Sequence, residues 1–90
     1  MLMKVEWEDL RFLEAIERTG KVASAARELN VSLSTLYRRI AELEHSLGYL
    51  CLQRGPSGGS LTETGRALAQ VGRRTRKSVD EVLAQLRTQS

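Results

Sequence analysis

The stretch NVSLSTLYRRIAELEHSLG, residues 30–48, places its polar side chains ahead of a regular apolar pattern. Ser32 is of a residue type that caps helix N-termini, and Gly48 is of a type that ends helices. Spacings of four and three residues give one apolar stripe, formed by Leu36, Ile40, Leu43 and Leu47. The pattern predicts a helix over residues 33–47 whose later turns are anchored in a core, while its first turns stay accessible.

Two shorter helical patterns precede this stretch. Residues 8–19 carry an apolar face and are followed by Gly20, and residues 22–29 repeat apolar side chains with helical spacing. Asn30 can take the left-handed conformation that ends a helix, so a tight turn should separate the second helix from the third. Two helices joined in this way, the second beginning with polar residues, predict a helix-turn-helix.

The pattern changes after the third helix. A short apolar run, the glycine-rich segment GPSGG and a second short apolar segment predict a β-hairpin over residues 49–61. A hairpin in this place corresponds to the wing of a winged helix. Thr62 is then the predicted cap of a long helix over residues 63–87. The predicted fold class is mainly α, a winged helix-turn-helix of three helices and a short β-hairpin wing, with a long C-terminal helix.

The polar front of the third helix suits DNA, because the major groove admits one α-helix by its first turns. At about 100° per residue, side chains 34 and 38 point away from the apolar stripe, and side chains 35, 37 and 39 lie on its flanks. The residues predicted to bind DNA are Ser32, Ser34, Thr35, Tyr37, Arg38 and Arg39 in this helix and Arg54 in the wing. Of these, Ser32 and Arg39 are better placed for phosphates than for bases. We expect the wing, near residues 53–60, on the minor groove or the backbone.

The long last helix carries an apolar stripe that a small domain has little left to cover. The stripe steps alternately by four and three residues, like a heptad seam, through Leu68, Gly72, Thr75, Val79, Val82 and Leu86. An uncovered stripe implies a partner helix, so we predict a homodimer through Leu68, Val79, Val82 and Leu86. The basic residues of this helix need no DNA contact to explain them, because such charges also keep a long helix soluble.

Composition sets limits on function. The 90 residues carry a net charge of +3, which suits one small domain and permits nucleic-acid binding. The lone Cys51 fits a reducing cytoplasm and is interpreted as a buried small hydrophobe. No signal peptide or membrane span is predicted. His45 has no convincing catalytic partners, and no P-loop or metal-ligand cluster occurs, so the sequence predicts neither an enzyme nor a cofactor.

Residues 25–68, AARELNVSLSTLYRRIAELEHSLGYLCLQRGPSGGSLTETGRAL, resemble the N-terminal DNA-binding domain of LysR-type transcriptional regulators. The similarity covers about residues 7–87. Its strongest elements are Ala25-Ala26, Leu29, Val31-Ser32, Leu36, Arg38, Ile40, Leu43-Glu44, Leu47-Gly48, Arg54 and Leu61-Thr62-Glu63 with Gly65. The resemblance implies a bacterial, cytoplasmic regulator of transcription that binds double-stranded DNA at a dyad-symmetric operator, as a dimer paired through the last helix.

We expect residues 1–62 to form the winged helix-turn-helix domain and residues 63–90 the linker or dimerisation helix. Members of the family usually continue into a ligand-binding effector domain where this chain stops, so we expect a fragment of a longer parent chain. Leu33, Ser34 and Tyr37 stand where the family often has glutamine, proline and serine, so the base preference should differ from the usual half-site. Two alternatives stay open: the N-terminal domain of a molybdate-responsive regulator, and a winged domain that binds another protein.

Overall fold

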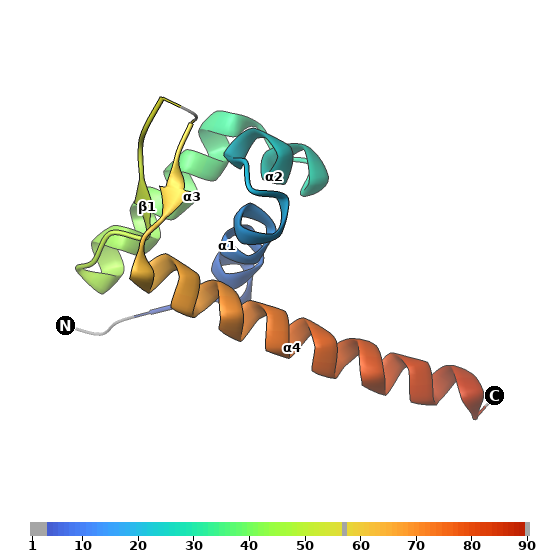
Figure 1. Cartoon of the computed structure of the whole chain (residues 1–90). Coiled ribbons are helices and arrows are strands. Elements are labelled where there is room, and N and C mark those ends of the chain that lie inside the picture. Colours follow the sequence, from blue (N-terminus) through green and yellow to red (C-terminus); the bar gives the residue numbers. More distant parts are fainter. Residues whose placement is uncertain (1–3, 57, 90) are drawn as a thin grey trace.

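The computed structural model describes residues 4–56 and 58–89 of the chain. In chain order the elements are α1 (Trp7–Thr19), α2 (Val22–Glu28), α3 (Leu33–Leu47), β1 (Leu52–Gln53), β2 (Ser60–Leu61) and α4 (Glu63–Thr88). Helices α1 to α3 and the hairpin gather into one body (Figure 1). The second half of α4, residues 77–88, extends away from this body and is called the arm. The predicted order of three helices, a β-hairpin and a long helix is confirmed.

Local sequence accounts for the ends of α3 and α4. The hydroxyls of Ser32 and Thr62 each accept a hydrogen bond of 3.1 Å from the backbone N–H three residues further on. These caps begin the two helices where the sequence predicted. Asn30 takes the left-handed conformation, with φ of 58°, and Gly48 ends α3 with φ of 79°. The turn between α2 and α3 is therefore as tight as predicted.

Three helix boundaries differ by one residue from those predicted. Helix α1 begins at Trp7 because Glu6 and Asp9 form a reciprocal capping box ahead of the apolar face. Helix α2 ends at Glu28, so Leu29 caps it from outside, and α4 continues to Thr88. The spacing of apolar residues shows which face of a helix is buried, whereas the last turn depends on single hydrogen bonds.

The core lies where α1 meets the other elements. Fully or nearly buried side chains come from every element of the body: Leu13, Ala15, Ile16, Val22, Ala25, Ala26, Leu36, Ile40, Leu43, Cys51, Leu52, Leu61 and Ala69. Cys51 is completely buried, which confirms its interpretation as a small hydrophobe. Burial, together with the nearby charges of Glu44 and Asp9, raises the pKa of the Cys51 thiol to about 11.

Helix α4 approaches the body at backbone distance through two glycines. A Cβ atom at Gly72 would lie 2.8 Å from the carbonyl oxygen of Leu10, and one at Gly65 would overlap the carbonyl oxygen of Cys51. Leu68 is half-buried against the core of its own chain. The stripe therefore divides in two, because Leu68 and Gly72 pack within the chain whereas Val79, Val82 and Leu86 stay exposed.

Candidate nucleic-acid interface

Three hydroxyl groups cluster at the N-terminus of α3. The Ser32 hydroxyl lies 2.8 Å from the Thr35 hydroxyl, to which it donates, and 3.2 Å from the Ser34 hydroxyl. Ser32 and Ser34 are exposed, and Thr35 is half-buried. A hydroxyl can donate and accept, so this cluster presents both kinds of hydrogen-bonding group at the free end of the helix.

The two arginines of α3 have different surroundings. Arg38 is exposed and makes no hydrogen bond or ion pair within residues 4–56 and 58–89. Arg39 is half-buried, its guanidinium 3.6 Å from the Asp9 carboxylate and 5.7 Å from the centre of the Phe12 ring. The charge of Arg39 is therefore partly used in joining α3 to α1, whereas the charge of Arg38 is available to a partner.

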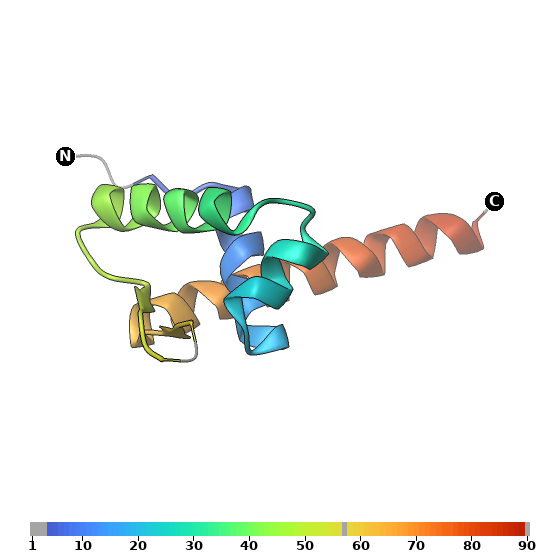
Figure 2. The ribbon, with the colours of Figure 1, turned by 90° about the horizontal axis from the view of Figure 1, so that it is seen from above.

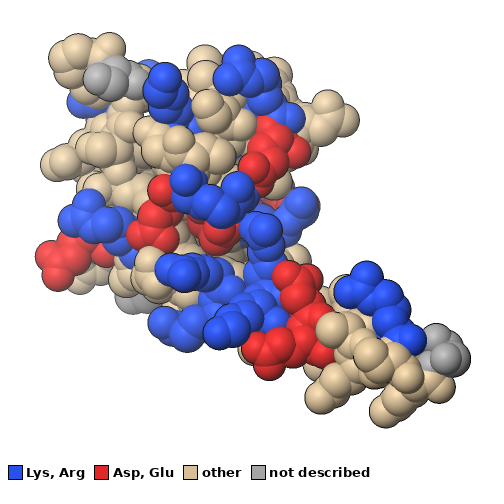
Figure 3. Space-filling view, turned by 45° about the vertical axis from the view of Figure 1, so that its right-hand side comes forward, with Lys and Arg blue, Asp and Glu red and all other residues tan. Residues whose placement is uncertain are grey.

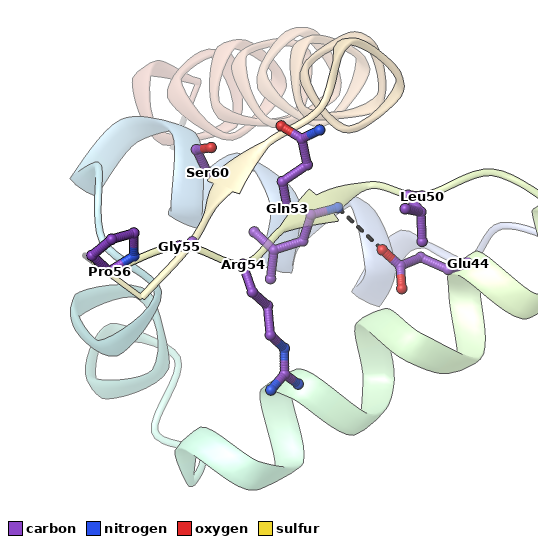
Figure 4. A pocket seen from close by; sticks show the side chains of 9 residues that line it. Glu44, Leu50, Gln53, Arg54, Gly55, Pro56 and Ser60 are labelled. Carbon is purple, nitrogen blue, oxygen red and sulfur yellow. Dashed lines mark hydrogen bonds between the residues drawn. The ribbon is translucent and has the colours of Figure 1, made fainter.

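The wing stands beside the front of α3. Its strands pair antiparallel, with Leu52 opposite Leu61. Arg54 is exposed and extends from the wing toward α3 (Figure 4). Its guanidinium carbon lies 4.4 Å from the centre of the Tyr37 ring, and the Tyr37 hydroxyl donates a hydrogen bond of 2.8 Å to the carbonyl oxygen of Gly58. Two predicted residues that are distant in sequence, Tyr37 and Arg54, are thus brought into contact by the fold.

Glu44 supports the base of the wing, a role the sequence did not predict. One of its carboxylate oxygens accepts the backbone N–H of Cys51 at 2.8 Å and that of Leu52 at 3.1 Å. The side chain reaches from α3 across to the wing, and an open groove of about 720 Å³ lies between them (Figure 4). The sequence did contain a hint of this role. Glu44 follows the inward-facing Leu43, so its side chain lies on the flank of the apolar stripe of α3 rather than on the side opposite to it.

Ion pairs elsewhere connect α1 to α2 and to α4. The buried Glu14 carboxylate accepts 2.9 Å hydrogen bonds from Arg18 and from Arg76, and so connects α1 to α4. Arg18 also pairs with Glu28, and this hydrogen bond lowers the pKa of the Glu28 carboxyl. Figure 3 shows basic and acidic side chains close together on one face where the arm leaves the body. Unlike Arg18 and Arg76, Arg38 and Arg54 have no acidic partner among the described residues, a property that Arg73 and Arg74 of α4 share.

The arm carries the second predicted surface. Every described residue of α4 beyond Arg76 is exposed, and the arm runs clear of the body in both views of the ribbon (Figures 1 and 2). Its large apolar side chains follow helical spacing: Val79, Val82, Leu83 and Leu86 are each exposed to between 48% and 57%. Three of the four predicted dimerisation residues lie on this stripe, which also contains Leu83. The fourth, Leu68, lies against its own core.

Other site classes receive no support from the described residues. No three histidine, cysteine or acidic side chains gather there as metal ligands. No described helix combines the length and the apolar character that crossing a lipid bilayer requires.

A helix-turn-helix with a wing and an unpaired arginine on the exposed face of its second helix defines the class of winged DNA-binding proteins. Residues 7–66 match the model of the bacterial regulatory helix-turn-helix proteins of the lysR family. The chain belongs to this family and carries its helix-turn-helix DNA-binding domain. The match favours the LysR type over the alternative of a molybdate-responsive regulator.

The relatives are transcriptional regulators. The chain is 44% identical over 66 residues to the Mau operon transcriptional activator of Paracoccus denitrificans, covering 73% of this chain and 23% of the activator. Among solved structures, the CbnR DNA-binding domain in complex with DNA matches with a TM-score of 0.74 and 30% identity, over 93% of this chain and 97% of that one. Full-length LysG from Corynebacterium glutamicum matches with a TM-score of 0.82 and 28% identity, over 96% of this chain and 30% of LysG. The chain therefore spans about a quarter of the length of the activator.

Proposed function

We propose that this chain binds double-stranded DNA in a sequence-specific way, as the operator-reading part of a cytoplasmic transcriptional regulator. The observation that carries this proposal is the exposed, unpaired Arg38 on the polar front of α3, a helix against which the wing places Arg54 on the ring of Tyr37. The solved complex of the related CbnR domain with DNA supports it. The chain would act by binding alone, without catalysis.

The proposed docking follows from the shape of the body. The front of α3 enters the major groove, where Arg38, Ser34 and Thr35 reach base edges and Ser32 approaches a phosphate. The wing, residues 53–60, lies on the minor groove or the backbone with Arg54. Arg39 takes a lesser part, because its guanidinium is already engaged with Asp9.

We also propose that two copies pair through the arms. The stripe of Val79, Val82, Leu83 and Leu86 is exposed in one copy and has the spacing of a helix–helix seam. A dimer with two-fold symmetry would place two α3 helices on a dyad-symmetric operator. Because the chain spans about a quarter of the related activator, we further propose that a parent chain adds an effector-binding domain.

The proposed role of α3 in reading the DNA sequence is tested by selecting bound sequences from random duplex DNA and then measuring the affinity of the chain for the selected site. Replacing Arg38 by alanine should weaken binding about 5- to 150-fold and relax the preference at one base pair, as expected for a lost bidentate contact of about 1–3 kcal/mol. If Arg38 contacts only a phosphate, Arg38→Ala should lower the affinity equally for all DNA sequences. The slope of log affinity against log salt concentration should then become smaller in magnitude by about 1.

Arg74→Ala is the matched control, because it removes the same charge from an exposed position on α4. This variant should keep the selected site and nearly all of the affinity. Equal binding by the Arg38→Ala and Arg74→Ala variants would show that α3 is not the reader. A wild-type chain that selects no DNA sequence would instead favour the winged domain that binds another protein.

The dimer is tested by light scattering over a range of concentrations. Val82→Asp places a charge in the middle of the exposed stripe and should convert dimers to monomers. Ala84→Asp is the control, because residue 84 lies on the opposite side of α4 from the stripe. A wild-type chain that stays monomeric at high concentration would contradict the pairing of these arms.

A further inference from the structure

Tyr37 is turned toward the wing rather than toward open solvent. It lies on α3 one position before Arg38 and is half-buried. Its hydroxyl donates its proton to the carbonyl oxygen of Gly58, 21 residues further along the chain, at 2.8 Å. The hydroxyl that could donate to a base edge is therefore engaged within the chain.

The aromatic ring of Tyr37 also contacts the guanidinium of Arg54 in the wing. The Arg54 guanidinium carbon lies 4.4 Å from the centre of the Tyr37 ring, well within the distance of a cation–π contact. Arg54 has no acidic partner among the described residues, so the ring is what orients it. Tyr37 thus contacts the wing on both sides of its tip, once through its hydroxyl and once through its face.

The tip of the wing needs such a support. Gly58 and Gly59 have φ of 103° and 149°, conformations that other residues rarely adopt. A glycine-rich tip loses much conformational entropy when it is held against DNA. A contact that orders the tip before DNA arrives reduces this loss, so it strengthens binding without touching the DNA itself.

We propose that Tyr37 is a positioning residue that holds Arg54 and the wing tip beside α3 and acts on DNA binding through the wing, rather than reading a base. This inference rests on the proposed function, because it assumes that α3 and the wing bind DNA together. It also revises the prediction that placed Tyr37 among the residues facing bases.

The proposal is tested with the 90-residue chain and the DNA site that the wild type selects. Tyr37→Phe removes only the hydrogen bond to Gly58 and should weaken binding about threefold. Tyr37→Ser removes the ring as well and should weaken it about tenfold. Tyr49→Phe is the matched control, because it removes the hydroxyl of the only other tyrosine, which is 63% exposed, and should leave binding unchanged.

A double-mutant cycle with Arg54→Ala separates the two roles. If the ring of Tyr37 acts through Arg54, Tyr37→Ser weakens binding only about threefold once Arg54 is absent, which is the loss assigned to the hydrogen bond with Gly58. Compared with the wild type, the Tyr37→Ser variant should protect the DNA less from hydroxyl radicals where the wing contacts it. Its protection of the major-groove half-site should be unchanged. A selection repeated with Tyr37→Phe should return the same base preference as the wild type.

Two results would overturn the inference while leaving the proposed function intact. One is a wild type that binds DNA but shows fully additive losses for Tyr37→Ser and Arg54→Ala. The other is a Tyr37→Phe variant that changes the preferred base while its wing footprint is unaltered. Failure of the proposed function shows separately, as a wild type that selects no DNA, and Tyr37→Phe keeps the test decisive if Tyr37→Ser does not fold.

Discussion

Replacing Glu44 by alanine should destabilise the whole domain, because this one carboxylate holds the base of the wing. Its oxygen accepts the N–H groups of Cys51 and Leu52, whose residues are 0% and 8% exposed. Alanine leaves both groups without a partner in a place that water reaches poorly. A hydrogen bond to a charged group contributes about 1.5–3 kcal/mol, and since both bonds share one oxygen we expect a loss of about 3 kcal/mol in total.

The loss can be measured by thermal and urea unfolding followed by circular dichroism. For a domain of this size, about 3 kcal/mol corresponds to a fall in Tm of roughly 12–24 °C. Glu44→Gln keeps an oxygen that can accept both N–H groups, so it should lose only about 1 kcal/mol. Glu42→Ala, at an exposed position of the same helix, should change stability by less than about 0.5 kcal/mol.

A Glu44→Ala variant as stable as Glu42→Ala would refute the reasoning. It would mean that the two N–H groups find other partners and that the wing does not depend on this contact. A loss shared equally by Glu44→Gln and Glu44→Ala would also count against it, because the charge and not the acceptor oxygen would then be the stabilising feature.

Two further predictions concern the packing of α4 and the buried thiol. Gly65→Ala should lower the free energy of unfolding by about 2 kcal/mol, because its Cβ would overlap the Cys51 carbonyl oxygen, even though alanine favours helices by up to about 1 kcal/mol. Ala67→Gly, at an exposed position of the same helix, should lower the free energy of unfolding by about 1 kcal/mol. If helix propensity alone decided stability, Gly65→Ala would instead stabilise the domain. A stabilised Gly65→Ala variant would therefore contradict the close approach of α4 to Cys51. Cys51, buried and with its pKa raised to about 11, should react with a thiol reagent at pH 8 only as fast as the chain unfolds, and at full rate in denaturant. Rapid reaction of the native chain would show that Cys51 is accessible.

Much of the fold was predictable because it depends on neighbours in the chain. Ser32 and Thr62 cap helices through backbone groups three residues away, and Asn30 turns the chain by its own conformation. The apolar stripe of α3 follows from a fixed period of the helix. The helix-turn-helix, its polar front and the exposure of Arg38 all follow from such local rules.

The contacts that shape the candidate site were not predictable in this way. Tyr37 looked like a flank residue of a helix, and only the folded chain brings Gly58 against its hydroxyl. Neighbouring arginines of α3 have the same chemistry, yet packing against α1 engages Arg39 and leaves Arg38 without a partner. Spacing within one helix does not reveal which distant element will lie beside each face.

The sequence by itself determined where helices start and stop, which of their faces are apolar, and that a polar helix front carries two arginines beside a glycine-rich hairpin. Tertiary structure decided which of these features face a partner. The stripe of α4 shows the reason: Leu68 and Gly72 have the same period as Val79 and Val82, but the first pair packs on its own body and the second stays exposed. Periodicity records that a face is apolar, whereas only the arrangement of the elements in space determines what covers it.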